Sequence, residues 1–238
     1  MKKRFINYAH RGASEYTPEN TFLSFYTGIF MQANGIETDV QLTKDGIPVL
    51  FHDDTLNRVT GENGRICDYT YAQLCNFTVK KNGLSDAIPT LEDFLMHFAS
   101  KNIVLAIELK SVGCAEKTAK LIKKYCSVEN TVVTSFKYDE LLAFKNFAPE
   151  YKCGYLTQSV SDELFERMKT DGISELCPEA CMISKPLCEK WHSLGFNVRA
   201  WGVINEQLML TSYNAGVDGM TVNFPDKLTK LLKERQRI

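Results

Sequence analysis

The sequence predicts an α/β fold, a (β/α)8 (TIM) barrel, on three observations. Its 238 residues suit one domain of about 200–250 residues, a size typical of such barrels. Strand-like runs alternate with segments of helical spacing, which indicates parallel strands joined by crossover helices. About eight such units fill the chain, and eight units close a barrel. An open, doubly wound sheet is the alternative that the same alternation allows.

Short runs rich in β-branched and aromatic residues are the expected strands. In chain order they are residues 5–9, 36–42, 49–51, 103–109, 131–135, 153–156, 197–201 and 217–222. Their length and composition are typical of strands. The sixth strand–helix unit is the weakest, because Ser174–Ile183 contains Pro178 and shows no clear alternation.

Segments with helical spacing separate most of these runs. They are residues 21–33, 91–98, 115–125, 138–147, 163–169, 187–194, 207–214 and 224–232. Thr17 followed by Pro18 is expected to begin the first helix, because a hydroxyl caps a helix and proline fits its first position. Thr90 begins a similar pattern. Gly195 and Gly216 are expected to end helices.

Residues 54–89 interrupt the alternation. They are rich in Gly, Asn and Thr, their helical spacing is poor, and they precede the helix expected after Thr90. We expect a small insertion after the second strand, placed above one end of the barrel. The chain has no linker or low-complexity segment, so residues 1–238 are expected to form a single domain.

Composition excludes several classes of protein. With 28 basic and 29 acidic residues the formal charge is −1, which disfavours non-specific binding of nucleic acid or of a membrane surface. The start of the chain lacks an apolar signal core, and no run of about 18 apolar residues occurs. The eight cysteines include no Cys-x-x-Cys pair and are expected to be reduced, small core residues. A cytoplasmic protein without stable membrane association is expected.

Alternation along two expected strands gathers acidic residues on one face. Glu37 and Asp39 share a face of residues 36–42, and Glu108 and Lys110 share a face of residues 103–109, because successive strand residues point to opposite sides. The other face of each strand is apolar or nearly so and is expected to pack under helices. The charges therefore collect inside the barrel near the carboxyl ends of strands, where active sites of this fold lie.

Three inward carboxylates need positive charge beside them, because burial of an unpaired charge has a large free-energy cost. Glu37, Asp39 and Glu108 carry three negative charges, against two positive charges on Arg11 and Lys110. One divalent cation would supply the remainder, and an all-oxygen site suits Mg²⁺ or Ca²⁺ better than zinc. The alternative is an internal salt-bridge network without metal.

Two of the four histidines end strand-like runs. His10 and His52 do so, whereas His97 and His192 lie in helical segments and are expected at the surface or the core edge. Two imidazoles beside an acid cluster form a plausible acid–base pair. Arg11, next to His10, can bind a phosphate through its forked donors.

A series of motifs follows in order along the chain. They are His10-Arg11-Gly12, Pro18-Glu19-Asn20-Thr21, residues 37–46, residues 48–53, Asp54-Thr55-Leu56-Asn57-Arg58, Pro89-Thr90-Leu91-Glu92 and Ile107-Glu108-Leu109-Lys110. Together they resemble the glycerophosphodiester phosphodiesterase family, and the resemblance extends from His10 to about Pro225.

The resemblance implies a fold and a set of roles. The family is a (β/α)8 barrel with a small insertion after the second strand. Carried over to this chain, the resemblance makes His10 and His52 the acid–base pair. It makes a group of acids the ligands of the divalent cation and two basic residues the phosphate contacts: Glu37, Asp39 and Glu108, and Arg11 and Lys110.

Two segments depart from the commoner family pattern. Trp201-Gly202-Val203-Ile204 stands where many relatives read W-T-V-N, and Val222-Asn223-Phe224-Pro225 stands where many read T-D-x-P. We expect both to line the mouth of the site rather than the metal core, which leaves substrate preference open. Phe136 and Trp201 either form an apolar wall for the glycerol or leaving group, or simply pack the rim.

The implied activity is metal-dependent hydrolysis of glycerophosphodiesters. Glycerophosphocholine and glycerophosphoethanolamine would yield sn-glycerol 3-phosphate and an alcohol. The sequence leaves open which histidine is the acid, and whether water or a substrate hydroxyl attacks phosphorus. Two alternatives remain: a phospholipase D-like enzyme acting on lysophospholipids, and a non-catalytic barrel that binds metal or phosphate.

Overall fold

Eight parallel strands close into a barrel in the computed structural model, which describes residues 4–235. The strands, in their order around the barrel, are β1 (Ile6–His10), β2 (Gly35–Leu42), β6 (Val104–Leu109), β7 (Thr131–Ser135), β8 (Lys152–Thr157), β9 (Glu175–Pro178), β10 (Asn197–Val203) and β11 (Gly219–Val222). β1 pairs with β2 on one side and with β11 on the other. This closure confirms the (β/α)8 barrel and excludes the open sheet.

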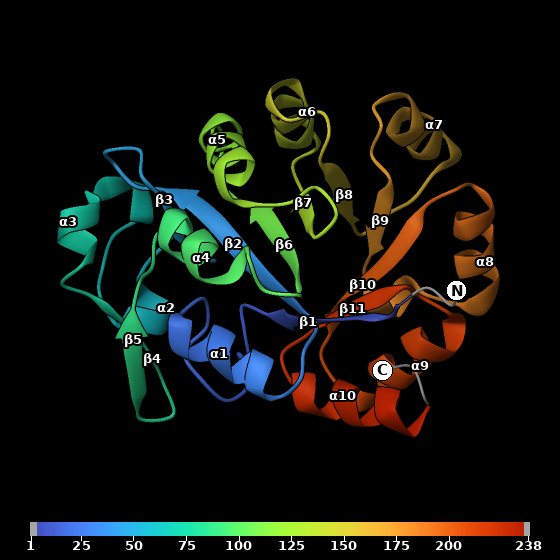
Figure 1. The fold of residues 1–238 in the computed structure, drawn as a ribbon, viewed down its shortest axis with the longest axis horizontal. Coiled ribbons are helices and arrows are strands. Elements are labelled where there is room, and N and C mark those ends of the chain that lie inside the picture. The colour runs from blue at the N-terminus through green and yellow to red at the C-terminus, as the bar shows by residue number, and fades with distance from the viewer. Residues whose placement is uncertain (1–3, 236–238) are drawn as a thin grey trace.

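Helices surround the strands (Figure 1). They are α1 (Phe22–Phe30), α4 (Leu91–Phe98), α5 (Ala115–Tyr125), α6 (Tyr138–Phe147), α7 (Asp162–Thr170), α8 (Lys185–Ser193), α9 (Glu206–Ala215) and α10 (Pro225–Glu234). No helix within residues 4–235 has the length and apolar character needed to cross a membrane.

The apolar strand faces pack under these helices, as the alternation predicts. Ile36, Val40 and Ile107 belong to the large core between strands and helices, whereas Ala106 contributes to a small cluster inside the barrel with Tyr8 and Val132. The Tyr8 ring fits there because its strand neighbours Gly35 and Gly219 lack side chains: a Cβ on either would lie about 3 Å from the ring. This apolar cluster lies one strand period before the polar residues that face inward at the carboxyl ends of the strands.

The insertion extends to one side of the barrel (Figure 1). It begins with β3 (Pro48–Leu50), antiparallel to β2, and continues through short helices and a hairpin: α2 (Asn57–Thr60), a 3-10 turn (Ile66–Asp68), α3 (Tyr71–Leu74), β4 (Thr78–Lys81) and β5 (Leu84–Ala87). It has its own apolar cluster, which includes Phe51, Leu56 and Ile66.

One expected barrel strand is wrong, and one barrel strand was not among those expected. The run at residues 49–51 is not a barrel strand, because β3 pairs with β2 in the antiparallel direction and Val49 forms a further antiparallel bridge with Thr90. The barrel strand that takes its place is β9, in the segment without clear alternation. All four residues of β9 are buried, and the face that carries Glu175 also carries the apolar Cys177, so the strand shows no regular polar–apolar alternation.

The first helix begins at Phe22 and not at Pro18. Thr21 is its cap and accepts a hydrogen bond from the backbone nitrogen of Ser24. Asn20 before it has a φ of 55°, a left-handed conformation that a helix cannot contain. Thr90 caps α4 and Gly216 ends α9 in the left-handed conformation, as predicted.

The cysteines are free thiols, as expected, but only half of them are buried core residues. Cys114, Cys153, Cys177 and Cys188 are buried, Cys126 is half-buried, and the other three are exposed: Cys67, Cys75 and Cys181.

Candidate active site

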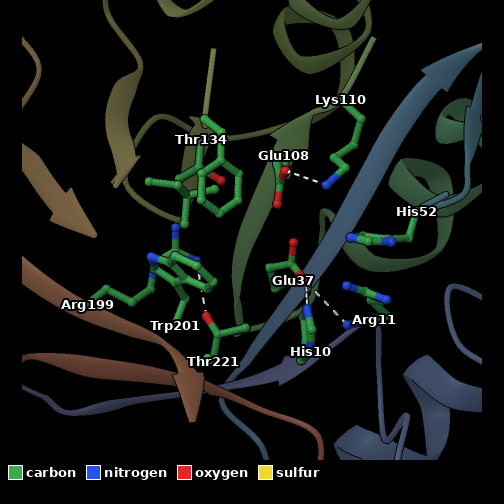
Figure 2. A pocket seen from close by; sticks show the side chains of 13 residues that line it. His10, Arg11, Glu37, His52, Glu108, Lys110, Thr134, Arg199, Trp201 and Thr221 are labelled. Atoms are coloured by element: carbon green, nitrogen blue, oxygen red, sulfur yellow. Dashed lines mark hydrogen bonds and ion pairs between the residues drawn. The ribbon is translucent and has the colours of Figure 1, made fainter. Parts of the chain in front are cut away.

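A cavity of about 260 Å³ lies inside the barrel at the carboxyl ends of the strands. Figure 2 shows two groups of side chains facing each other across it: one from β1, β2, β6 and the insertion, and one from β7, β10 and β11. The lining includes His10, Arg11, Glu37, His52, Glu108, Lys110, Thr134, Phe136, Arg199, Trp201 and Thr221. Eight of the nine residues singled out from the sequence are in this lining, and Asp39 lies in direct contact with Arg11 and Lys110.

The three acids meet as the alternation predicts. Asp39 and Glu108 are register partners on β2 and β6, and Glu37 precedes Asp39 by one full period of the strand. One oxygen of each of the three carboxylates lies within 4.8 Å of the others, and all three residues are buried.

Positive groups offset only part of this charge. Arg11 Nε lies 3.1 Å from Asp39 Oδ2, and Lys110 Nζ lies 3.0 Å from Glu108 Oε1 and 3.8 Å from Asp39 Oδ1. Asn20 donates a hydrogen bond of 2.9 Å to Asp39 Oδ2. Asn20 was not among the residues predicted for the site.

The pKa values show which carboxyl carries the charge. Burial opposes the charge on Asp39, yet Arg11, His52 and Lys110 hold the pKa of that carboxyl below its usual range. Burial and the charge of Asp39 raise the pKa of Glu108 to about 7. Burial and both neighbouring acids also raise the pKa of Glu37. Asp39 is therefore the acid that is charged most readily, and mutual repulsion in the buried cluster opposes full ionisation of Glu37 and Glu108 unless further positive charge is added.

These acids fit a divalent cation. Asp39 Oδ1 is buried and accepts no hydrogen bond from residues 4–235, although a buried carboxylate oxygen normally has a partner. Oxygen atoms from three carboxylates form the hard donor set that Mg²⁺ and Ca²⁺ prefer. The salt-bridge network alone leaves this oxygen unsatisfied, which favours a metal site over the metal-free alternative.

The two histidines have different partners. His10 Nδ1 donates to Asn223 Oδ1 at 2.5 Å, and its Nε2 lies 3.8 Å from Glu37 Oε2. Burial and the charge of Arg11 lower the pKa of His10 to about 3. His52 Nδ1 lies 2.6 Å from the Asp53 carboxylate. Both rings present Nε2 to the cavity, because Nδ1 is engaged in each case.

Asp53 is itself held by an ion-pair network that joins the insertion to the barrel. Arg58 on α2 contacts Asp53 Oδ2 through Nε at 2.5 Å, and its terminal nitrogens donate to Glu19 at 2.7 and 2.8 Å. Glu19 also accepts from Arg11 at 2.8 Å. The insertion thus fixes His52 relative to Arg11.

Comparison with known proteins agrees with this geometry. The model of the glycerophosphoryl diester phosphodiesterase family matches residues 10–227. The chain belongs to this family. The family's match includes both histidines and all three acids, and it confirms the expectation of an enzyme.

Relatives of known name extend over nearly the whole chain. A glycerophosphodiester phosphodiesterase of Caldanaerobacter subterraneus is 32% identical over 95% of this chain and 97% of its own. A phosphodiesterase of Oleispira antarctica, solved with its product sn-glycerol-3-phosphate, is 28% identical, with a TM-score of 0.89 and 97% of each chain covered. A structure from Silicibacter pomeroyi, 22% identical, shares the fold with a TM-score of 0.90 over 99% of this chain and 95% of its own.

The aromatic residues singled out from the sequence form one edge of the cavity in this family member. Phe136 and Trp201 pack edge to face with ring centroids 4.9 Å apart. Phe136 is 40% exposed, and Lys110 Nζ lies 5.8 Å from its ring centre. This placement agrees with an apolar wall at the rim.

Two functional candidates were missed by sequence reasoning. Asn223 was expected only at the mouth of the site, but it bonds directly to the His10 ring. Arg199 lines the cavity, although it is only 2% exposed. Alternation along residues 197–201 places Arg199 on the same face as Trp201, so an inward arginine was a signal available in the sequence.

Proposed function

We propose that this protein hydrolyses glycerophosphodiesters to sn-glycerol 3-phosphate and a free alcohol. The observation that carries the proposal is that two histidines, two cations and two of the three clustered acids line one cavity of about 260 Å³, with Asp39 in contact with both cations. Glycerophosphocholine and glycerophosphoethanolamine are the expected substrates. Family membership and the product bound to the Oleispira relative support the same reaction.

The cationic side chains bind and stabilise the phosphate. Arg11 and Lys110 lie on the cavity wall beside the acids, so their positive charge is in place before the reaction begins. Charge builds on the phosphoryl oxygens as the phosphorus–oxygen bond breaks, and fixed cations stabilise it most at that stage.

The histidines move the protons. One imidazole takes a proton from the attacking hydroxyl, which is either water or the neighbouring hydroxyl of the glycerol. In the second case a cyclic phosphate forms first, and water then opens it to sn-glycerol 3-phosphate. The other gives a proton to the alcohol oxygen as its bond to phosphorus breaks, so proton uptake balances proton release. Each Nε2 is available for this because Asn223 and Asp53 engage the Nδ1 atoms.

Glu37, Asp39 and Glu108 would hold one divalent cation, Mg²⁺ or Ca²⁺. Such an ion supplies Lewis acidity and a binding point for substrate oxygens. It would also give a direct partner to Asp39 Oδ1, which accepts no hydrogen bond from residues 4–235.

Product analysis tests the proposal. Purified protein is incubated with glycerophosphocholine, glycerophosphoethanolamine and lysophosphatidylcholine, each with Mg²⁺, with Ca²⁺ and with excess chelator. Release of sn-glycerol 3-phosphate from the two diesters, lost in chelator, is the expected result. Turnover of the lysophospholipid alone would support the phospholipase D-like alternative, and binding without product would support a non-catalytic barrel.

A further inference from the structure

The cavity has a closed end that the proposed chemistry does not use. We define the closed end by Thr134, Arg199 and Thr221, which come from β7, β10 and β11, together with the buried Nε1 of Trp201, whose ring also packs against Phe136 at the rim. Figure 2 shows them across the cavity from Lys110, His52 and Arg11. Thr134 and Arg199 are 1% and 2% exposed, whereas Phe136 at the rim is 40% exposed. The cavity is therefore buried at Arg199 and open at Phe136.

Hydrogen-bond donors at the closed end lack partners. Thr134 Oγ1 and Trp201 Nε1 are buried and bond to nothing in the part of the chain that the structure describes. The terminal nitrogens of Arg199 make only long contacts, at 3.5 Å, to Thr221 Oγ1 and Cys177 Sγ. A guanidinium has five N–H groups, so part of its donor capacity remains for a ligand.

Two residues that do not line the cavity hold Arg199 in place. Its guanidinium carbon lies 4.8 Å from the centre of the Tyr8 ring, and its Nε lies 3.0 Å from Glu175 Oε1. Tyr8 is itself fixed between Gly35 and Gly219. A charged side chain fixed in this way loses little conformational freedom when it binds a ligand.

The chemistry of the closed end selects an electron-rich oxygen. Arg199 and Trp201 only donate hydrogen bonds, and Thr134 can donate as well. A hydroxyl of the substrate can accept from them, whereas an ammonium group would face a fixed positive charge. An esterified, acylated oxygen would bring a long apolar chain into the buried end of the cavity.

The shape of the cavity indicates which hydroxyl this is. The part common to all glycerophosphodiesters is glycerol, and the part that varies is the alcohol. A buried end suits the constant part, and the open rim at Phe136 suits the variable part. Given the proposed function, we propose that Arg199 is a specificity-determining residue that binds the free primary hydroxyl of glycerol and thereby selects deacylated diesters over lysophospholipids.

A substrate lacking that hydroxyl provides the test. kcat/KM is measured for glycerophosphoethanolamine and for its analogue with hydrogen in place of the primary hydroxyl. For the wild-type protein we expect about a 10- to 100-fold loss with the analogue, the usual range for a hydrogen bond to a charged group. Equal kcat/KM for the two substrates would overturn the inference whatever the variants do.

Variants connect the loss to Arg199. The double variant Arg199→Met/Glu175→Gln removes both buried charges together, since Arg199→Met alone would leave Glu175 unpaired. We expect it to turn over the two substrates within about threefold of each other, because the discriminating contact is gone. A folded double variant that still discriminates as the wild type does would overturn the inference. Arg167→Met, at an exposed ion pair on α7, is the matched control and should discriminate normally.

A binding measurement covers the remaining outcomes. If the double variant does not fold, Arg199→Lys keeps a charge beside Glu175 and should still lower the discrimination. If no diester is hydrolysed, the proposed function fails, and the inference is tested separately by ligand binding. The rise in Tm is measured with sn-glycerol 3-phosphate and with 1,2-propanediol 1-phosphate, which lacks the primary hydroxyl. An equal rise in Tm with the two ligands would overturn the inference. The inference would be supported if 1,2-propanediol 1-phosphate needed a concentration at least several-fold higher to give the same rise in Tm.

Discussion

His10 and Asn223 lie 213 residues apart in the sequence, and their side chains share a hydrogen bond of 2.5 Å between Nδ1 and Oδ1. β1 and β11 are adjacent in the closed barrel, so the first and last strands bring the two residues together. Ser14 Oγ donates to the same amide oxygen at 3.0 Å. Asn223 therefore fixes the tautomer and the orientation of the His10 ring through a neutral acceptor.

Loss of this acceptor should lower the rate without unfolding the protein. We expect Asn223→Ala to reduce kcat/KM by about two- to tenfold, the effect of a hydrogen bond worth about 0.5–1.5 kcal/mol. Asn223→Asp keeps an acceptor at the same place and should recover most of the rate. Steady-state assays of sn-glycerol 3-phosphate release, with melting curves for each variant, measure this. An Asn223→Ala enzyme as fast as the wild type would mean that the contact does not orient His10.

Removal of either histidine should be more severe. His10→Ala and His52→Ala are each expected to lower kcat by about 10²–10⁴, the usual contribution of a general acid or base. His97, exposed on α4, offers a matched control, and His97→Ala should retain full activity. Undiminished turnover in either cavity variant would remove that residue from the proposed chemistry.

Binding of a divalent cation should stabilise the protein through the three acids. At a concentration of 100 Kd, a ligand that binds only the folded state adds about 2.7 kcal/mol. For a chain of 238 residues this corresponds to a rise in Tm of about 5–10 °C. Glu37→Gln, Asp39→Asn and Glu108→Gln should each lose this rise, and Glu116→Gln on the exposed face of α5 should keep it. Differential scanning calorimetry with Mg²⁺, Ca²⁺ and chelator measures the effect, and a rise that persists in Asp39→Asn would place the ion elsewhere.

Metal affinity should weaken as the pH falls through 7. The pKa of Glu108 is raised to about 7 by burial and by Asp39, so this carboxyl is protonated below pH 7 and charged above it. A cation binds the charged form, and binding at lower pH must therefore release a proton. We expect an apparent Kd at least about tenfold weaker at pH 6 than at pH 8, since Glu37, whose pKa is also raised, adds to the effect. Isothermal titration calorimetry in two buffers of different ionisation enthalpy reports the proton directly, and a Kd independent of pH would contradict the coupling.

Local alternation was sufficient to predict the acid cluster. Glu37 and Asp39 share a strand face whatever the rest of the fold does, because the side-chain period of a strand is two residues. Glu108 follows from the same rule on its own strand. Strand-end positions indicated His10 and His52, alternation indicated Lys110, and the guanidinium beside His10 indicated Arg11. The family motifs implied the same residues, and the structure places all of them around the cavity.

The partners of these residues depended on contacts distant in the sequence. β9 shows no clear alternation because both of its faces are buried. β3 is strand-like, but it pairs antiparallel with β2 and is not one of the eight parallel barrel strands. Asn223 reaches His10 only because the barrel closes, and Arg199 becomes a cavity residue only because Tyr8 and Glu175 lie beneath it. The sequence by itself determined which side chains point inward, since that follows from local strand geometry. Only the tertiary structure decided which of them meet, because strand pairing and barrel closure join segments that no local pattern relates.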